Sequence, residues 1–265
     1  MHRLIYEFKC SCSEEQLRII NHLWPYEKSS TFRVGVMKLV PKVHKLEGLI
    51  SHESWKKLSS RPIRGAEMDP MRFPSKVLFR LLNNMLQGFQ KWYETMSVLL
   101  PFKFPVITGC DEFSSRVKEL RLDRSKMMQT TFLSADFGDA YTETGISSLQ
   151  ASIRLIGEQI GVDYHEIDLM VKLVNLVFSN CYFFTPFGLY KQTRGMPMGD
   201  YSSRDSLDLH LVKSEYEILL ELSKLSSSIH LYCRLVDDIS VIIQGDFSTV
   251  RLVLQKMSYF ILKCH

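Results

Sequence analysis

Three aspartates that lie far apart in the sequence are the residues best suited to chemistry. Asp136 ends an apolar stretch in the segment SADFGDAY, and the adjacent pair Asp237 and Asp238 separates two β-rich runs, 229–235 and 239–243. The spacing predicts a strand that ends at Asp136 and a hairpin with the other two acids at its tip. Adjacent carboxylates in a tight turn repel each other, and a divalent cation would compensate their charge.

The donor atoms near these aspartates indicate which metal would bind. With neither His nor Cys nearby, hard oxygen ligands favour Mg²⁺ or Mn²⁺ over zinc. If the strand end and the hairpin tip lie side by side in one sheet, Asp136 and Asp237 can bridge two ions about 4 Å apart, which suits in-line displacement at phosphorus. The six cysteines are scattered without a C-x-x-C pair, so they indicate no zinc site.

A third feature is a loop bounded by glycines, residues 192–200 with the sequence QTRGMPMGD. It leads into an amphipathic helix that we expect to begin with Asp200 as its N-cap and to run toward Leu225. Glycine lets the backbone approach a ligand closely, and a junction between loop and helix suits a nucleotide. The three features together predict a site for phosphoryl chemistry.

Strands and helices are both expected around this site, which makes the fold class α+β. Helices are predicted at 13–24, with Ser13 and Gln16 in capping-box spacing, and from 77 to 96. An edge strand is expected at 34–43 because Pro41 interrupts it. The remaining predictions are a strand at 130–137, helices at 146–160, 163–180 and 249–257, and a strand pair at 181–193; residues 101–128 are left unassigned.

Composition excludes several classes of protein. The chain has 265 residues, 45% hydrophobic and 23% charged, which excludes intrinsic disorder as the main state. Its apolar runs are far shorter than the roughly 20 residues that span a bilayer, and its first residues do not resemble a signal peptide. We therefore expect an intracellular protein without a membrane partner. Residues 33–80 carry eleven Lys or Arg and four acids, which indicates a polyanionic partner unless this is only a solvated basic face.

The ordered motifs resemble those of reverse transcriptases. The segment 134–141 is similar to motif A, 192–199 to motif B and 234–238 to motif C, while 39–45 and 61–63 resemble the two fingers motifs that precede them. The details are most similar to Penelope-like and other non-retroviral retroelement enzymes. The resemblance covers roughly residues 33–262.

This resemblance implies a right-hand polymerase fold, in which an antiparallel palm sheet backed by helices carries a fingers subdomain. It divides the chain into an N-terminal helical extension (1–32), fingers (33–100) and palm (101–265), with fingers residues interleaved at 146–190. A thumb is expected to be missing, so the sequence is interpreted as a fingers-palm fragment of a longer protein with further domains. The implied partners are an RNA template, a DNA primer and deoxynucleoside triphosphates.

The resemblance also assigns roles to single residues. Asp136 and Asp237 would bind two Mg²⁺ ions, which Mn²⁺ can replace, with Asp238 as a third catalytic carboxylate and the Phe137 carbonyl as an extra ligand. Contacts to the triphosphate and to the nucleotide pocket are implied for Arg61, Lys42, Lys45, Gln192 and Gly195. Tyr141 would collide with a ribose 2′-hydroxyl, which favours DNA synthesis; a half-buried core tyrosine is the alternative interpretation.

Several features leave other functions open. Leu235 stands where the family usually has an aromatic residue, and Asp200, Asp205 and Asp208 place acids where the family's template strand runs. A catalytically decayed nucleic-acid-binding remnant of the same fold is therefore an alternative. An RNA-dependent RNA polymerase is disfavoured by Tyr141, and a phosphohydrolase would not need the fingers motifs.

Overall fold

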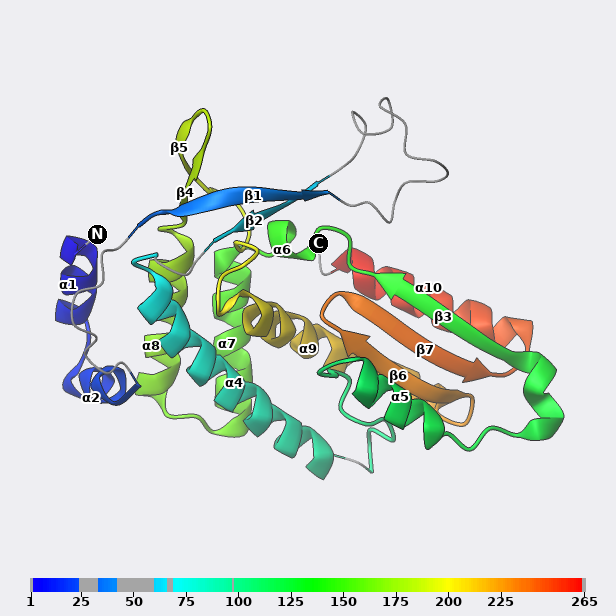
Figure 1. Cartoon of the computed structure of the whole chain (residues 1–265). Helices are drawn as coiled ribbons and strands as arrows, with labels where there is room; N and C mark the ends of the chain where they lie inside the picture. The colour runs from blue at the N-terminus through cyan, green and yellow to red at the C-terminus, as the bar shows by residue number, and fades with distance from the viewer. Residues whose placement is uncertain (1, 24–32, 42–59, 66–68, 97, 264–265) are drawn as a thin grey trace, which may run out of the picture.

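The computed structural model describes residues 2–23, 33–41, 60–65, 69–96 and 98–263 of the chain. Helices occupy the middle of the molecule, and two β-sheets lie at different sides of them (Figure 1). One sheet has three antiparallel strands in the order β3-β7-β6, and the other has four strands in the order β2-β1-β4-β5. The expected α+β class is confirmed in this coarse form. Within these residues, no helix is both long and apolar enough to cross a membrane.

The three-stranded sheet contains β3 (Thr130–Asp136), β6 (Ile229–Leu235) and β7 (Asp238–Gln244). The central strand β7 alternates as a half-buried strand should, because the side chains of Ile239, Val241 and Ile243 are fully buried and the residues between them are more exposed. On β6, Leu231 and Cys233 pack with Ile107 in a second, smaller core. The predicted hairpin is confirmed, but its turn consists of Val236 and Asp237, and Asp238 already belongs to β7.

The main core is built by long helices: α4 (Arg72–Thr95), α7 (Ile146–Ile160), α8 (Tyr164–Phe178), α9 (Ser203–Leu222) and α10 (Phe247–Lys263). Helix α4 begins earlier than the sequence pattern indicated. Pro74 lies in its first turn, where a missing N–H breaks no helical hydrogen bond. The expected N-cap of α9 was wrong: the cap is Ser202, and Asp200 precedes the helix.

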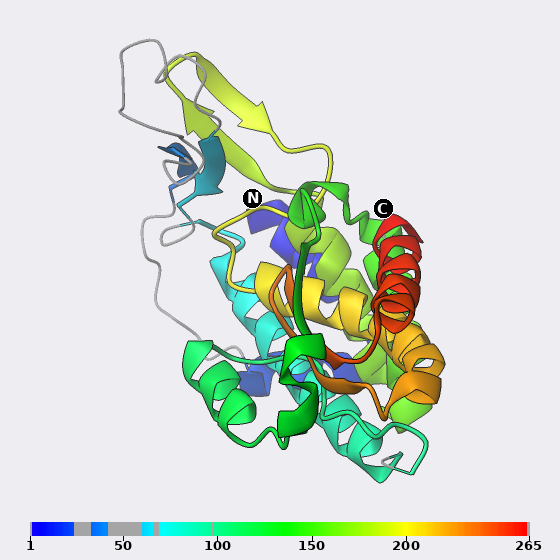
Figure 2. The ribbon, with the colours of Figure 1, turned by 90° about the vertical axis from the view of Figure 1, so that its right-hand side faces the viewer.

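The four-stranded sheet joins segments that are distant in the sequence. Strands β1 (Gly35–Pro41) and β2 (Ser60–Arg64) pair in antiparallel fashion, and β1 also pairs in parallel with β4 (Tyr182–Thr185), which continues into β5 (Gly188–Lys191). The prediction of an edge strand at 34–43 was wrong, because β1 lies between β2 and β4. Figure 2 shows the hairpin of β4 and β5 standing away from the helices.

Shorter elements complete the described chain. The first two helices are α1 (His2–Cys10) and α2 (Glu14–Leu23). The capping box of α2 is confirmed. The backbone N–H of Gln16 donates to Ser13 Oγ at 3.2 Å, and the backbone N–H of Ser13 donates to the side-chain Oε1 of Gln16 at 3.0 Å. The unassigned segment forms α5 (Cys110–Lys118) and the 3₁₀ helix η2 (Arg124–Gln129), and α6 (Ala140–Glu143) and η3 (Ser223–Leu225) are short turns of helix.

Candidate active site

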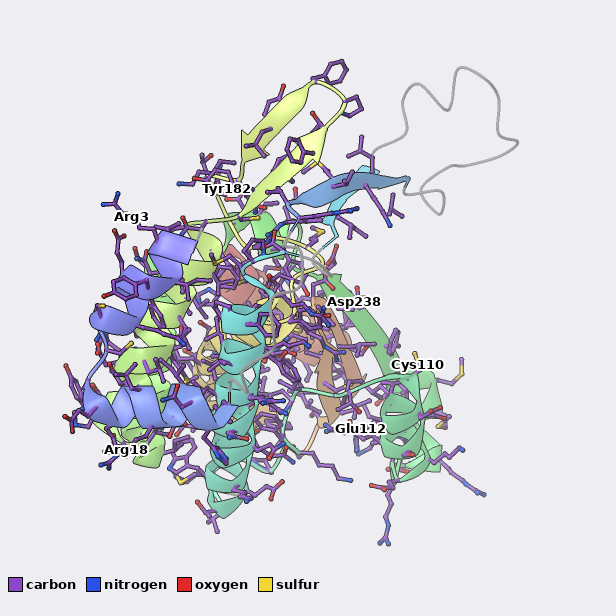
Figure 3. All side chains as sticks on the ribbon, turned by 60° about the vertical axis from the view of Figure 1, so that its left-hand side comes forward. Arg3, Arg18, Cys110, Glu112, Tyr182 and Asp238 are labelled. Atoms are coloured by element: carbon purple, nitrogen blue, oxygen red, sulfur yellow. The ribbon has the colours of Figure 1, made fainter. Side chains whose placement is uncertain are left out.

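Three carboxylates meet at one end of the three-stranded sheet. Asp136 ends β3 and is paired directly with Asp238, the first residue of β7, while Asp237 lies in the adjacent turn. One oxygen of each carboxylate lies within 4.8 Å of the others, and Asp136 and Asp238 are exposed. Figure 3 shows Asp238 at the end of the sheet nearer to β1 and β2. Among the described residues, no other three His, Cys, Asp or Glu side chains meet in this way.

This cluster could hold a hard divalent cation. Like charges placed directly opposite each other on neighbouring strands destabilise a sheet, so the register is costly without a counter-ion. All the side-chain donors are carboxylate oxygens, the ligands that Mg²⁺ and Mn²⁺ prefer. Asp139, three residues after Asp136, does not belong to the cluster. The Phe137 carbonyl accepts a hydrogen bond from the Ala140 amide at 3.3 Å, and its role as a metal ligand stays a prediction.

The turn that carries Asp237 has an unusual backbone conformation at the preceding residue, Val236. Val236 has φ of 60°, a region that β-branched residues rarely adopt. The Phe137 amide donates to the Asp237 carbonyl at 3.1 Å, which ties the turn to the end of β3. Strained backbone of this kind persists only where the surrounding structure determines it, and it is common at functional sites.

Tyr141 lies between the carboxylates and the glycine-bounded loop. Its side chain is partly buried against the core, and burial, with smaller contributions from Asp208 and Asp237, raises its pKa to about 12. The phenol is therefore neutral at physiological pH. Its backbone carbonyl accepts a hydrogen bond from the Met196 amide at 2.6 Å, so the loop is fastened to the segment that follows Asp136.

The loop 192–200 approaches this segment so closely that glycine is required. Gly195 has φ of +71°, and a Cβ atom there would lie 2.4 Å from the Tyr141 carbonyl oxygen. The Gln192 side chain supports the loop from within, because its Nε2 donates to the Arg194 carbonyl at 2.9 Å. The structure thus brings Gly195 next to Tyr141, whose pKa Asp237 influences, while Gln192 contacts the loop itself; the contact of all three residues with a nucleotide stays a prediction.

The structure describes the basic residues predicted to bind the triphosphate only in part. Arg61 lies in β2 opposite Val40, and only its backbone is described. Lys42 and Lys45 lie outside the described residues.

The sequence indicated that three acids at the start of α9 would lie near a template strand, but two of them are buried. Asp200 is buried rather than presented to a template, with Oδ2 3.9 Å from Arg64 Nη1. Arg64, itself 3% exposed, also forms an ion pair with Asp69. Asp208 is buried as well and pairs with Arg234 at 2.6 Å. Asp205 is partly exposed, and burial beside Asp208 raises its pKa to about 6.

Sequence reasoning missed the buried partners of Arg234, although a signal was present. Asp208 and Glu215 are seven residues apart, two turns along α9, and both are on the face that carries Leu211, Leu219 and Leu222 into the core. A charged residue on an apolar helix face demands a buried partner of opposite charge.

Solved structures share this fold. No family model and no curated protein matches the chain. A telomerase from Candida albicans, solved with a TWJ fragment of telomeric RNA, is 13% identical with a TM-score of 0.59 over 92% of this chain and 43% of that one. Apo telomerase from Candida tropicalis is 15% identical with a TM-score of 0.56, over 97% and 46% of the two chains.

These matches define a reverse-transcriptase-like fold, since telomerase is a reverse transcriptase. At such low identity, the likeness concerns the fold alone. It supports the reverse-transcriptase part of the sequence resemblance and gives no support to the Penelope-like part. The chain spans less than half the length of the telomerase chains that it matches.

Proposed function

We propose that this chain carries the polymerase core of a reverse transcriptase and catalyses DNA synthesis directed by an RNA template. The observation that carries the proposal is the meeting of Asp136, Asp237 and Asp238 at the end of the three-stranded sheet, in a fold shared with telomerase. The loop 192–200 and Tyr141 beside the acids add the surfaces that a nucleotide would need.

Each part of the site has a task in this proposal. When bound, two divalent cations supply the charge that lowers the pKa of a primer 3′-hydroxyl and neutralises the departing pyrophosphate. Asp136 and Asp237 hold the cations, and Asp238 adds a third carboxylate. The neutral ring of Tyr141 limits the space beside the sugar C2′. Arg61, with Lys42 or Lys45, contacts the triphosphate, while Gln192 and Gly195 line the nucleotide pocket.

The proposed partners are an RNA template, a DNA primer and deoxynucleoside triphosphates. Support for RNA comes from the Candida albicans telomerase structure, which contains a fragment of telomeric RNA. Because the chain covers less than half of the matched chains, we propose that it works with further domains. The retroelement origin indicated by the motifs is part of the same proposal.

Single-nucleotide addition tests the function. The chain is incubated with an RNA template, a labelled DNA primer, one dNTP and Mg²⁺ or Mn²⁺. We expect extension by one nucleotide, abolished by Asp136→Asn or Asp237→Asn and retained by Asp139→Asn. Primer–template binding without extension under every metal condition would instead favour the decayed remnant, and equal use of rNTPs would favour an RNA polymerase.

A further inference from the structure

The side chain of Arg234 is fully buried directly beneath the carboxylate-bearing turn. It is 0% exposed and is the largest fully buried side chain among the described residues. Its Nη1 lies 2.6 Å from Asp208 Oδ1, and its Nε lies 2.9 Å from Glu215 Oε1. The same Nη1 also donates to the Val236 carbonyl. One guanidinium therefore connects two acids of α9 with the residue that precedes Asp237.

Burying this charge is costly, so its partners must be well placed. Glu215 is completely buried, and its Oε1 also accepts a hydrogen bond from the Tyr232 hydroxyl at 3.2 Å. Burial lowers the pKa of Arg234, but the two neighbouring carboxylates outweigh this effect and raise the pKa above its already high usual range, which keeps the guanidinium charged. The planar guanidinium holds its donors in a fixed fork that spans both acids and a carbonyl, whereas a lysine ammonium is a compact charge without that fixed geometry.

The backbone around Arg234 is equally constrained. Its amide donates to the Pro105 carbonyl at 2.8 Å, and its carbonyl accepts from the Ile107 amide at 2.9 Å. Two residues later, Val236 adopts its positive φ while its side chain packs against the core. The turn is thus held from below by Arg234 and from the side by the bond between Phe137 and Asp237.

We propose that Arg234 is a positioning residue for the metal site: through the Val236 carbonyl it sets the place of Asp237 relative to Asp136 and Asp238. This inference rests on the proposed function, because it treats the three aspartates as metal ligands. Through Asp208, the same side chain ties the metal site to α9, the helix that follows the loop 192–200. Arg234 supports the carboxylates without touching a substrate.

The test compares the same substitution at two buried arginines. Arg234→Lys keeps the charge and removes the fork. Arg64→Lys is the matched control, because Arg64 is also buried between two acids, Asp69 and Asp200, but does not contact the turn. Mn²⁺ affinity is measured by the loss of the free-ion EPR signal, and stability by urea unfolding. Partners that orient metal ligands typically change metal affinity by about 10–100-fold.

We expect both variants to lose stability, and Arg234→Lys alone to bind Mn²⁺ at least about tenfold more weakly. Unchanged Mn²⁺ affinity in Arg234→Lys, or equal loss in Arg64→Lys, would overturn the role of Arg234 while leaving the metal site intact. If Arg234→Lys does not fold, the charge-balanced pair Arg234→Gln with Glu215→Gln replaces it under the same two criteria. Wild-type protein whose Mn²⁺ affinity does not differ from that of Asp136→Asn would instead contradict the metal site, and this inference with it.

Discussion

The crowding of three carboxylates predicts that the metal-free protein becomes more stable when one charge is removed. Asp136 is the best position for this change, because its exposed side chain makes no hydrogen bond or ion pair with the described residues and lies directly opposite Asp238. Asp136→Asn keeps the size and shape of the side chain and removes two unfavourable charge pairs. A residue kept for function at a cost in stability behaves in this way.

The magnitude follows from the separation of the oxygens. One oxygen of each carboxylate lies within 4.8 Å of the others, and two unit charges at that separation repel by about 1 kcal/mol in a water-like dielectric. Asp136 takes part in two such pairs, and salt screens both because the Asp136 side chain is exposed. We therefore expect Asp136→Asn to raise the free energy of unfolding by about 1–2 kcal/mol at low ionic strength, and by much less in about 1 M salt.

Urea unfolding checks this expectation under three conditions: EDTA at low salt, EDTA at high salt, and saturating Mg²⁺. The variant should be more stable than wild type only in the first, since Mg²⁺ stabilises the wild-type cluster preferentially. Asp139→Asn is the control, because Asp139 is exposed, lies outside the cluster and has a positive φ that Asn tolerates equally well. A metal-free Asp136→Asn protein no more stable than wild type, or an equal gain in Asp139→Asn, would refute the reasoning.

Three further predictions concern residues around the site. Tyr141→Ala should open space beside C2′ and shift the ratio of kcat/KM for dNTPs and rNTPs toward rNTPs by about 1–3 kcal/mol, measured by single-nucleotide addition; an unchanged ratio would show that Tyr141 is no steric gate. Gly195→Ala should destabilise the fold by at least about 1 kcal/mol in urea unfolding, because its Cβ would collide with the Tyr141 carbonyl. Burial lowers the pKa of His210, which contacts Ser152, from 6.5 to about 4. The unfolded chain therefore binds more protons between about pH 6.5 and pH 4, and the free energy of unfolding should fall by up to about 3 kcal/mol as pH drops through that window. His210→Gln should remove this part of the pH dependence, and an unchanged pH profile would contradict the assignment.

The strands that carry the acids could be predicted because their sequence patterns are local. Alternating burial at Ile239, Val241 and Ile243 marks β7, and the two-residue turn makes the hairpin before it recognisable. The prediction that Asp136 would lie beside the hairpin tip with Asp237 needed one assumption, that β3 joins the same sheet as the hairpin. The register confirms it.

Long-range pairings could not be predicted in the same way. Asp200 looks like a surface acid in a polar stretch, and only the arrival of Arg64 from a distant strand offsets the free-energy cost of burying it. Likewise, Pro41 indicates an edge strand, yet β1 needs only Gly35 and Val36, at its other end, to pair with β4. Side-chain partners of this kind are properties of the tertiary fold.

The parallel pairing of β1 with β4 has a consequence for the order in which the protein can fold during synthesis. Gly35 and Val36 leave the ribosome long before their partners Phe183 and Phe184, and the strand that will lie inside the sheet is first exposed on one edge. Its Val36 and Val40 side chains remain exposed even in the finished structure, so the nascent β1–β2 pair offers an apolar, unpaired edge to other chains. The three aspartates are also made at different times, because Asp136 is synthesised well before Asp237. The cluster of three aspartates can therefore form only after nearly the whole described chain has been synthesised, when the slow closure of distant segments is complete.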